Sequence, residues 1–218
     1  GGEKEFIAAP RLDDLECVFA ATKAFLAGEN RENVTVLALF DNEEIGSLTR
    51  QGADSTFLGD VLERVALSCG KDREGLYRAI AGGFMLSADN AHAVHPDSPE
   101  KSDPTNRCYL NEGVVVKHSP RYASDALTAG VFQAICQKAG VPVQVYYNNS
   151  RIPGGGTLGN LSGSHVALPT VDIGLPQLSM HSPYETAGAK DLEYMVQAME
   201  AFYQTVLTVT GQDAYEIS

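Results

Sequence analysis

The sequence has little positive charge. It contains 16 lysines and arginines against 28 aspartates and glutamates, a formal net charge of −12. Binding a nucleic acid requires a basic face that neutralises phosphates, so this shortage argues against nucleic acid as a partner. An acidic substrate is not excluded, because it responds to the local field of a pocket rather than to the net charge.

Long apolar runs and paired cysteines are also lacking. No stretch approaches the roughly 20 apolar residues of a membrane helix, and no basic segment followed by an apolar run marks a signal peptide. The four cysteines are far apart, and no CxxC pair suggests a zinc knuckle or a redox site. We therefore expect a cytoplasmic protein with reduced, mostly buried thiols and no membrane association.

Patterns typical of strands and helices alternate along the chain. Residues 34–40 form a continuous β-branched and aliphatic run, which is typical of a strand buried on both faces of a parallel sheet. Shorter strands are expected at 84–87, 113–117, 143–147 and 171–173. Apolar periodicity predicts helices at 14–26, 55–69, 124–139 and 191–208. Residues 1–218 are thus expected to form a single α/β domain with a mostly parallel or mixed central sheet and helices on both faces.

Acidic and histidine side chains follow the ends of these predicted strands or precede the first helix. They are Asp13, Glu43, Glu44, Asp89, His92 and His181. Carboxylates together with imidazoles suit zinc, cobalt or manganese better than calcium, which takes only oxygen ligands. One carboxylate can bridge two metals about 3.5–4 Å apart, and of two adjacent acids one can bind metal while the other transfers a proton.

Each candidate also has a structural interpretation. An acidic pair such as Glu43 and Glu44 can be a solvated turn. Asp13 can be a helix N-cap, and His181 can be a partly buried histidine whose ring nitrogens are satisfied. Convergence of these residues on one edge of a sheet favours the metal site over the separate structural roles.

The glycine run at residues 154–159 matches GxGxxG. A dinucleotide fingerprint requires the glycines to leave a strand directly and open a helix, whereas residues 148–153 intervene here. A tight loop, or a loop lining a substrate cleft, are the other interpretations. No GxSxG motif supports serine-hydrolase chemistry.

Five segments in order make the sequence similar to a known family. They are residues 9–13, 40–47, 87–96, 121–124 and 176–182. On these segments the chain resembles the aspartyl aminopeptidase family of cocatalytic zinc metallopeptidases. The resemblance implies a zinc-peptidase-like fold that holds two divalent metal ions, with zinc favoured over cobalt or manganese.

The resemblance also implies a role for each matched residue. Asp13 would bridge the two metals, Glu44 and His181 would complete one metal site, Asp89 would serve the other, and Glu43 would be the general base. His92, Lys117 and Tyr122 match positions that face the substrate. The implied reaction is hydrolysis of the first bond of a peptide by a water whose pKa the two metals lower, with Glu43 carrying the proton to the leaving amine.

The substrate and the class of activity each leave an alternative open. The Lys117 ammonium would suit an acidic N-terminal residue, Asp or Glu, although a solvated lysine at a strand end is the structural interpretation. A broad or neutral aminopeptidase of the same chemistry is one alternative. A non-catalytic metal-binding or assembly module is another, but such a module needs ligands and no base, so the intact Glu43 argues against it.

Two parts of the family pattern have no match in the sequence. The family supplies another histidine ligand and an aspartate that orients the base from a preceding segment, and it carries an inserted assembly domain. We therefore expect residues 1–218 to be the C-terminal portion of a catalytic domain, poorly active alone. The full-length protein is expected to act on peptides and to form a homo-oligomer.

Overall fold

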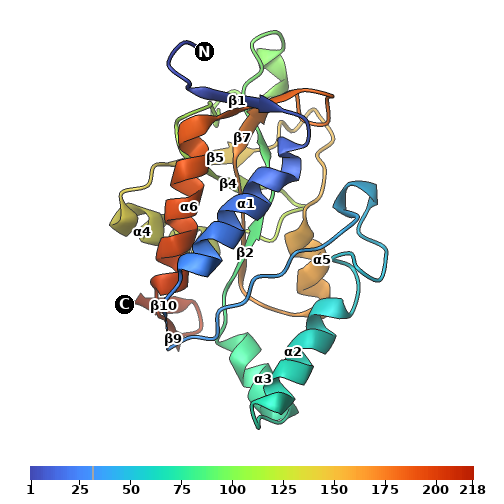
Figure 1. Cartoon of the computed structure of the whole chain (residues 1–218), viewed down its shortest axis with the longest axis vertical. Coiled ribbons are helices and arrows are strands. Elements are labelled where there is room, and N and C mark those ends of the chain that lie inside the picture. The colour runs from blue at the N-terminus through green and yellow to red at the C-terminus, as the bar shows by residue number, and fades with distance from the viewer. Residues whose placement is uncertain (31) are drawn as a thin grey trace.

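The computed structural model describes residues 1–30 and 32–218, and a four-stranded mixed sheet lies at its centre (Figure 1). The strands lie in the order β2 (Met85–Ala88), β6 (Thr170–Gly174), β4 (Val114–His118) and β5 (Val143–Tyr147). The pairs β2–β6 and β4–β5 are parallel, whereas β4 and β6 are antiparallel. The expectation of a mixed α/β sheet is confirmed.

Three helices cover one face of this sheet. They are α1 (Leu12–Ala27), α4 (Ala126–Ala139) and α6 (Ala189–Gln204), and α1 lies beside α6 (Figure 1). The core between these helices and the sheet contains Ala20, Ala24, Val114, Val116, Phe132, Val171, Ile173, Met195 and Met199. The intervening strand residues Val115 and Asp172 point to the opposite face, because side chains alternate along a strand. That face carries α5 (Leu158–His165).

A second four-stranded sheet continues from the first. Its order is β1 (Phe6–Ala9), β8 (Glu185–Gly188), β7 (Pro176–Leu178) and β3 (Ala91–His92). The chain passes from β2 into β3 and from β6 into β7. Strand β2 pairs with β6 in the first sheet and β3 pairs with β7 in the second, and both pairings are parallel. Gly174 allows this close crossing, since a Cβ there would lie 2.1 Å from the carbonyl oxygen of Asp89. The junction of the two sheets is where the acidic residues gather.

The remaining elements lie around this frame. The helices α2 (Phe57–Ser68) and α3 (Arg73–Ala81) form a hairpin at one end, and β9 (Leu207–Gly211) pairs with β10 (Ala214–Ile217) (Figure 1). Short 3₁₀ turns are η1 (Glu43–Ile45) and η2 (Pro99–Lys101). Over residues 1–30 and 32–218, no helix is both long and apolar enough to cross a membrane. All four cysteines are free, and Cys69 alone among them is exposed.

Local signals explain where several predicted elements begin and end. In α4 the Asp125 carboxylate accepts a hydrogen bond from the Thr128 backbone N–H at 2.7 Å, and the helix stops at Gly140, whose φ is 71°. The strands predicted at 84–87, 113–117, 143–147 and 171–173 are confirmed within about a residue as β2, β4, β5 and β6. The helix predicted at 191–208 ends earlier, at Gln204, because the chain turns into β9.

The strand predicted at residues 34–40 is wrong. This segment is neither helix nor strand, and Val34, Val36 and Leu39 are 84%, 47% and 51% exposed. Leu37 packs against the core, and the Tyr203 hydroxyl donates to the Val36 carbonyl at 3.3 Å. An apolar β-branched run records a preference for extended backbone, but a strand also needs a neighbouring edge. The described part of the chain supplies no such edge here.

Candidate metal centre

Asp13 sits at the irregular start of α1. Its backbone, with φ −78° and ψ 114°, is not yet helical, and the preceding Arg11 adopts a left-handed conformation. The Asp13 side chain is only 4% exposed. Its backbone N–H donates to the Glu185 carboxylate at 3.0 Å, and Arg11 rather than Asp13 stands at the N-cap position of α1. The carboxylate is free to face the junction of the two sheets.

Glu43 and Glu44 are presented by a tight turn. Left-handed residues flank η1 on both sides, Asn42 with φ 60° and Gly46 with φ 99°. The Gly46 and Ser47 backbone N–H groups close the turn on the carbonyls of Glu43 and Asn42, each at 2.9 Å. Glu43 and Glu44 therefore lie in a well-defined turn rather than in an irregular loop. Glu44 is exposed to solvent, whereas Glu43 is partly buried.

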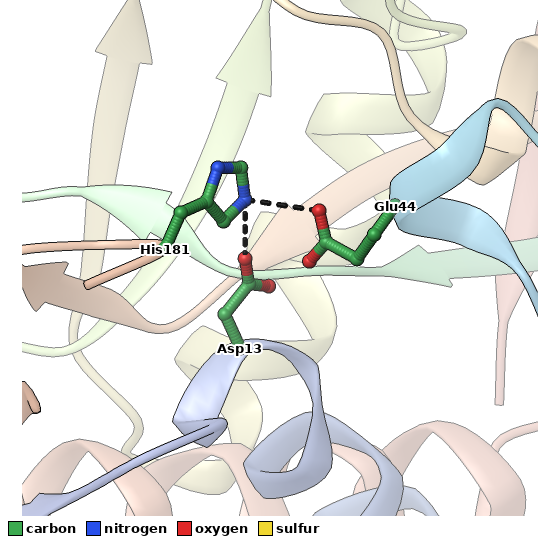
Figure 2. A group of neighbouring side chains, drawn as sticks. All are labelled: Asp13, Glu44 and His181. Atoms are coloured by element: carbon green, nitrogen blue, oxygen red, sulfur yellow. Dashed lines mark ion pairs between the residues drawn. The ribbon is translucent and has the colours of Figure 1, made fainter. Parts of the chain in front are cut away.

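His181 joins these two segments (Figure 2). Its Nε2 lies 3.0 Å from Asp13 Oδ2 and 3.0 Å from Glu44 Oε2, as the dashed lines in Figure 2 show. The three side chains come from α1, η1 and the loop after β7, which are far apart in sequence. One carboxylate oxygen from each acid and the histidine nitrogen lie within 4.8 Å of one another. This is an N,O donor set of the type that zinc takes.

A second group of ligand-type atoms shares Asp13. It consists of Asp13, Asp14 and Asp89, whose oxygens again lie within 4.8 Å of one another. Asp89 follows β2 at the sheet junction, and Asp14 Oδ1 is buried without a hydrogen-bond partner among the described residues. The two donor sets therefore overlap and share the Asp13 carboxylate. Sequence reasoning did not single out Asp14, although it is adjacent to Asp13.

The charges in the site are strongly unbalanced. Burial, together with the charges of Asp89 and Glu44, raises the pKa of Asp13 to about 9. Burial also raises the pKa of Glu43 to about 7, with Asp89 and Glu44 adding to the effect. Carboxylates crowded into a poorly solvated space resist ionisation, and a bound cation removes that resistance. The electrostatics therefore fit divalent metals at these residues.

Lys117 is the main positive charge built into this region. It lies in β4, is 2% exposed, and donates from Nζ to Asp89 Oδ2 at 3.3 Å and to the carbonyls of Asp89 and Asn90 at 3.1 and 3.0 Å. Burial alone would lower its pKa, but Asp89 raises it above the ordinary value, so the amine remains charged. The interpretation of Lys117 as a solvated strand-end lysine is wrong.

Tyr122 and His92 complete the predicted set. The Lys117 Nζ lies 5.4 Å from the centre of the Tyr122 ring, and burial raises the pKa of the Tyr122 hydroxyl. His92 is on β3, next to β7, and it is exposed at the surface, although partial burial of its ring lowers its pKa. The roles of both residues toward a substrate stay predictions.

Glu185 was missed by sequence reasoning. It is 2% exposed in β8, and its two oxygens accept hydrogen bonds from the backbone N–H groups of Asp13, at 3.0 Å, and His181, at 2.7 Å. One buried carboxylate thus fixes the main chain of two candidate ligands. No local pattern announces this role, because the acceptor lies 172 residues from Asp13 in the sequence.

Comparison with known proteins identifies the family of this chain. Residues 1–203 match the family of aminopeptidase I zinc metalloproteases, M18. A probable M18 family aminopeptidase 2 from Clostridium acetobutylicum is 48% identical over 205 residues, which cover 93% of this chain and 47% of that protein.

Two solved structures share the fold. An M18 aminopeptidase from Thermotoga maritima superposes with a TM-score of 0.86 at 26% identity, over 94% of this chain and 47% of that one. The mApe1 dodecamer of S. cerevisiae gives 0.80 at 33% identity, over 94% and 47%. The chain therefore spans about half the length of these relatives. By the extent of these matches, the chain belongs to the aminopeptidase I (M18) family of zinc metalloproteases.

Proposed function

We propose that the full-length protein is an aminopeptidase that removes the N-terminal residue of peptides with two divalent metal ions, zinc by preference, and a glutamate base. The observation that carries this proposal is the pair of donor sets that share Asp13, with Glu43 held beside them. Asp13, Glu44 and His181 would hold one metal, and Asp13 and Asp89 the other. Asp14 belongs to the second donor set as well.

The chemistry divides between the metals and the chain. Bound metals would supply Lewis acidity toward a water molecule and the peptide carbonyl. Glu43 would accept a proton from the attacking water and return it to the departing amine. A base that also acts as an acid works best when its pKa lies near the ambient pH, and the burial of Glu43 shifts its pKa upward in that direction.

Substrate preference rests on Lys117 and Tyr122. We propose that acidic N-terminal residues are preferred, because a buried ammonium beside an aromatic ring attracts a carboxylate. Asp89 and Asn90 already accept hydrogen bonds from this ammonium, so a substrate carboxylate would compete with them. Because Asp89 and Asn90 already occupy the Lys117 ammonium, the alternative is an aminopeptidase with a broad or neutral preference. Faster turnover of Leu-anilide than of Asp- or Glu-anilide by the full-length enzyme would contradict the acidic preference.

The test of the proposed chemistry compares two adjacent substitutions in the full-length protein. Glu43→Gln should lower kcat by about 10²-fold or more while zinc content stays unchanged, because it removes a proton carrier and no ligand. Glu44→Gln should lower zinc content as well as kcat, because it removes a ligand. Undiminished turnover in Glu43→Gln would refute the proposed base. Zinc binding without any peptidase activity in the unsubstituted protein would instead favour a metal-binding module.

The remaining parts of the proposal concern the whole protein. We propose that it forms a homo-oligomer, as the S. cerevisiae relative solved as a dodecamer does. A further ligand from outside residues 1–218 would complete the site, so these residues alone should be poorly active. Light scattering of the full-length protein and a comparison of kcat/KM between the two lengths test these points. A cytoplasmic location stays a prediction, which cell fractionation can check.

A further inference from the structure

Asp172 is a buried carboxylate whose hydrogen-bond donors, among residues 1–30 and 32–218, are all uncharged. It lies in β6, is 0% exposed, and points away from the core between α1, α4 and α6. Its Oδ1 accepts hydrogen bonds from the hydroxyls of Ser87, at 2.7 Å, and Thr157, at 2.6 Å, while Oδ2 accepts one from the Ala123 backbone N–H at 2.5 Å. Burying a carboxylate among neutral donors costs free energy, so the arrangement calls for an explanation.

The three donors come from three separate segments. Ser87 belongs to β2, two residues before Asp89, Ala123 to the loop after β4, and Thr157 to the start of α5. The Asp172 main chain adds a fourth contact, since its N–H donates to Ser124 Oγ at 2.8 Å. Asp172 therefore ties the loop 119–125 and the glycine-rich loop 148–157 to the central sheet.

Thr157 makes this connection in place of an ordinary local one. It is the N-cap residue of α5, where a threonine hydroxyl normally accepts a hydrogen bond from its own helix, yet no such bond forms. Gly159 shows how closely the helix approaches, because a Cβ there would lie 2.9 Å from Asp172 Oδ1 and 3.0 Å from Ser87 Oγ. Thr157 and Gly159 thus both serve the contact with Asp172. This structural role explains the GxGxxG pattern at residues 154–159, which does not meet the requirements of a dinucleotide-binding motif.

The loop 119–125 reaches the metal centre through Tyr122, and the glycine-rich loop is joined to it through their shared contact with Asp172. Ala123 directly follows Tyr122, whose ring lies 5.4 Å from the Lys117 Nζ, and Lys117 is bonded to Asp89. In the other loop, Gly155 and Gly156 are exposed, and a Cβ on either would meet nothing within 4 Å. Their backbone is consequently open on the outer side, while Thr157 directly after them is buried.

We propose that Asp172 is a positioning residue that fixes both loops as substrate-contacting walls of the active site. The proposal rests on the aminopeptidase function argued above, and it assigns no chemical step to Asp172. The carboxylate acts through Tyr122 and through the backbone at residues 155–156. Loss of one tether should therefore weaken substrate binding rather than metal binding or proton transfer.

The experiment removes one of two equivalent hydroxyls in the full-length enzyme. Thr157→Val and Ser87→Ala each delete one donor to the same Asp172 oxygen, but only Thr157→Val frees a loop. We expect Thr157→Val to raise KM about tenfold with kcat changed less than about threefold, and Ser87→Ala to leave KM within about twofold. Thr157→Ser keeps the hydroxyl and should restore KM, and zinc content should be the same in all variants.

Hydrogen exchange supplies a readout that does not depend on activity. Thr157→Val should speed amide exchange at residues 154–158 relative to Ser87→Ala, and Asp172→Ala should speed it at 120–124 as well. Equal KM values in Thr157→Val and Ser87→Ala, or unchanged amide exchange at residues 154–158 in Thr157→Val, would overturn the proposal. This test remains decisive even when Asp172→Ala does not fold. If the unsubstituted enzyme cleaves no peptide, the proposed function fails, while the exchange data still decide whether the loops are tethered.

Discussion

Substituting Asp13 by asparagine should stabilise the metal-free protein while abolishing its stabilisation by zinc. The pKa of the Asp13 carboxyl is raised from 3.8 to about 9, by burial first and then by Asp89 and Glu44. In the folded protein Asp13 therefore retains a proton that the unfolded chain releases as soon as the pH exceeds about 4. The folded state binds more protons across that window, so its stability falls as the pH rises toward 9.

The size of the effect follows from the same values. A difference of one pH unit corresponds to about 1.4 kcal/mol. The interval between the ordinary pKa of 3.8 and pH 7 therefore limits the stability that metal-free protein loses through Asp13 to about 4 kcal/mol. Several neighbouring carboxylates contribute to this rise in pKa, and solvent screens part of their repulsion, which reduces the figure to about 1–2 kcal/mol. For a chain of this length, that is a gain of about 2–8 °C in Tm for metal-free Asp13→Asn at pH 7.

The assay is differential scanning fluorimetry from pH 5 to 8.5, with a chelator or with zinc. Wild-type protein should lose Tm with rising pH when metal-free and recover it with zinc, whereas Asp13→Asn should show a flatter pH dependence and little response to zinc. Asp97→Asn, an exposed aspartate outside the site, is the matched control and should behave like wild type. A metal-free Asp13→Asn that is less stable than wild type at pH 8 would refute the electrostatic argument.

Two further predictions concern positions outside the ligand set. Glu185→Gln leaves one of the N–H groups of Asp13 and His181 without an acceptor, so zinc affinity measured by competition with a chelator should fall about 10–100-fold, and an unchanged affinity would exclude the clamp. In α5, Gly159→Ala should destabilise the protein by about 1–3 kcal/mol in urea unfolding, because the added methyl would overlap Asp172. Gly163→Ala, in the same helix with open space around it, should instead gain up to about 1 kcal/mol, and equal effects of the two would contradict the close approach.

The sequence by itself determined what depends on neighbours along the chain. Helix α4 ends before Gly140 as the sequence predicts and begins within two residues of the predicted start, because helix caps and stops act within one turn. The chemical types of Asp13, Glu44 and His181 indicated a metal site, since carboxylates and imidazoles at strand ends are few and specific in their chemistry. Their convergence in the structure supports that prediction, while their individual roles stay untested.

Tertiary structure decided what depends on distant partners. Residues 34–40 have every local feature of a buried strand and still lie unpaired, because pairing needs an edge that sequence periodicity does not reveal. The buried carboxylates of Glu185 and Asp172 read as ordinary acids in the sequence, and only folding brings their donors from segments far apart in the sequence. Lys117 likewise becomes a buried ammonium only because Asp89 and Asn90 fold against it. Hydrogen bonds between residues so far apart leave no pattern in the local sequence. The structural roles of Glu185, Asp172 and Lys117 can therefore be identified only from the tertiary structure.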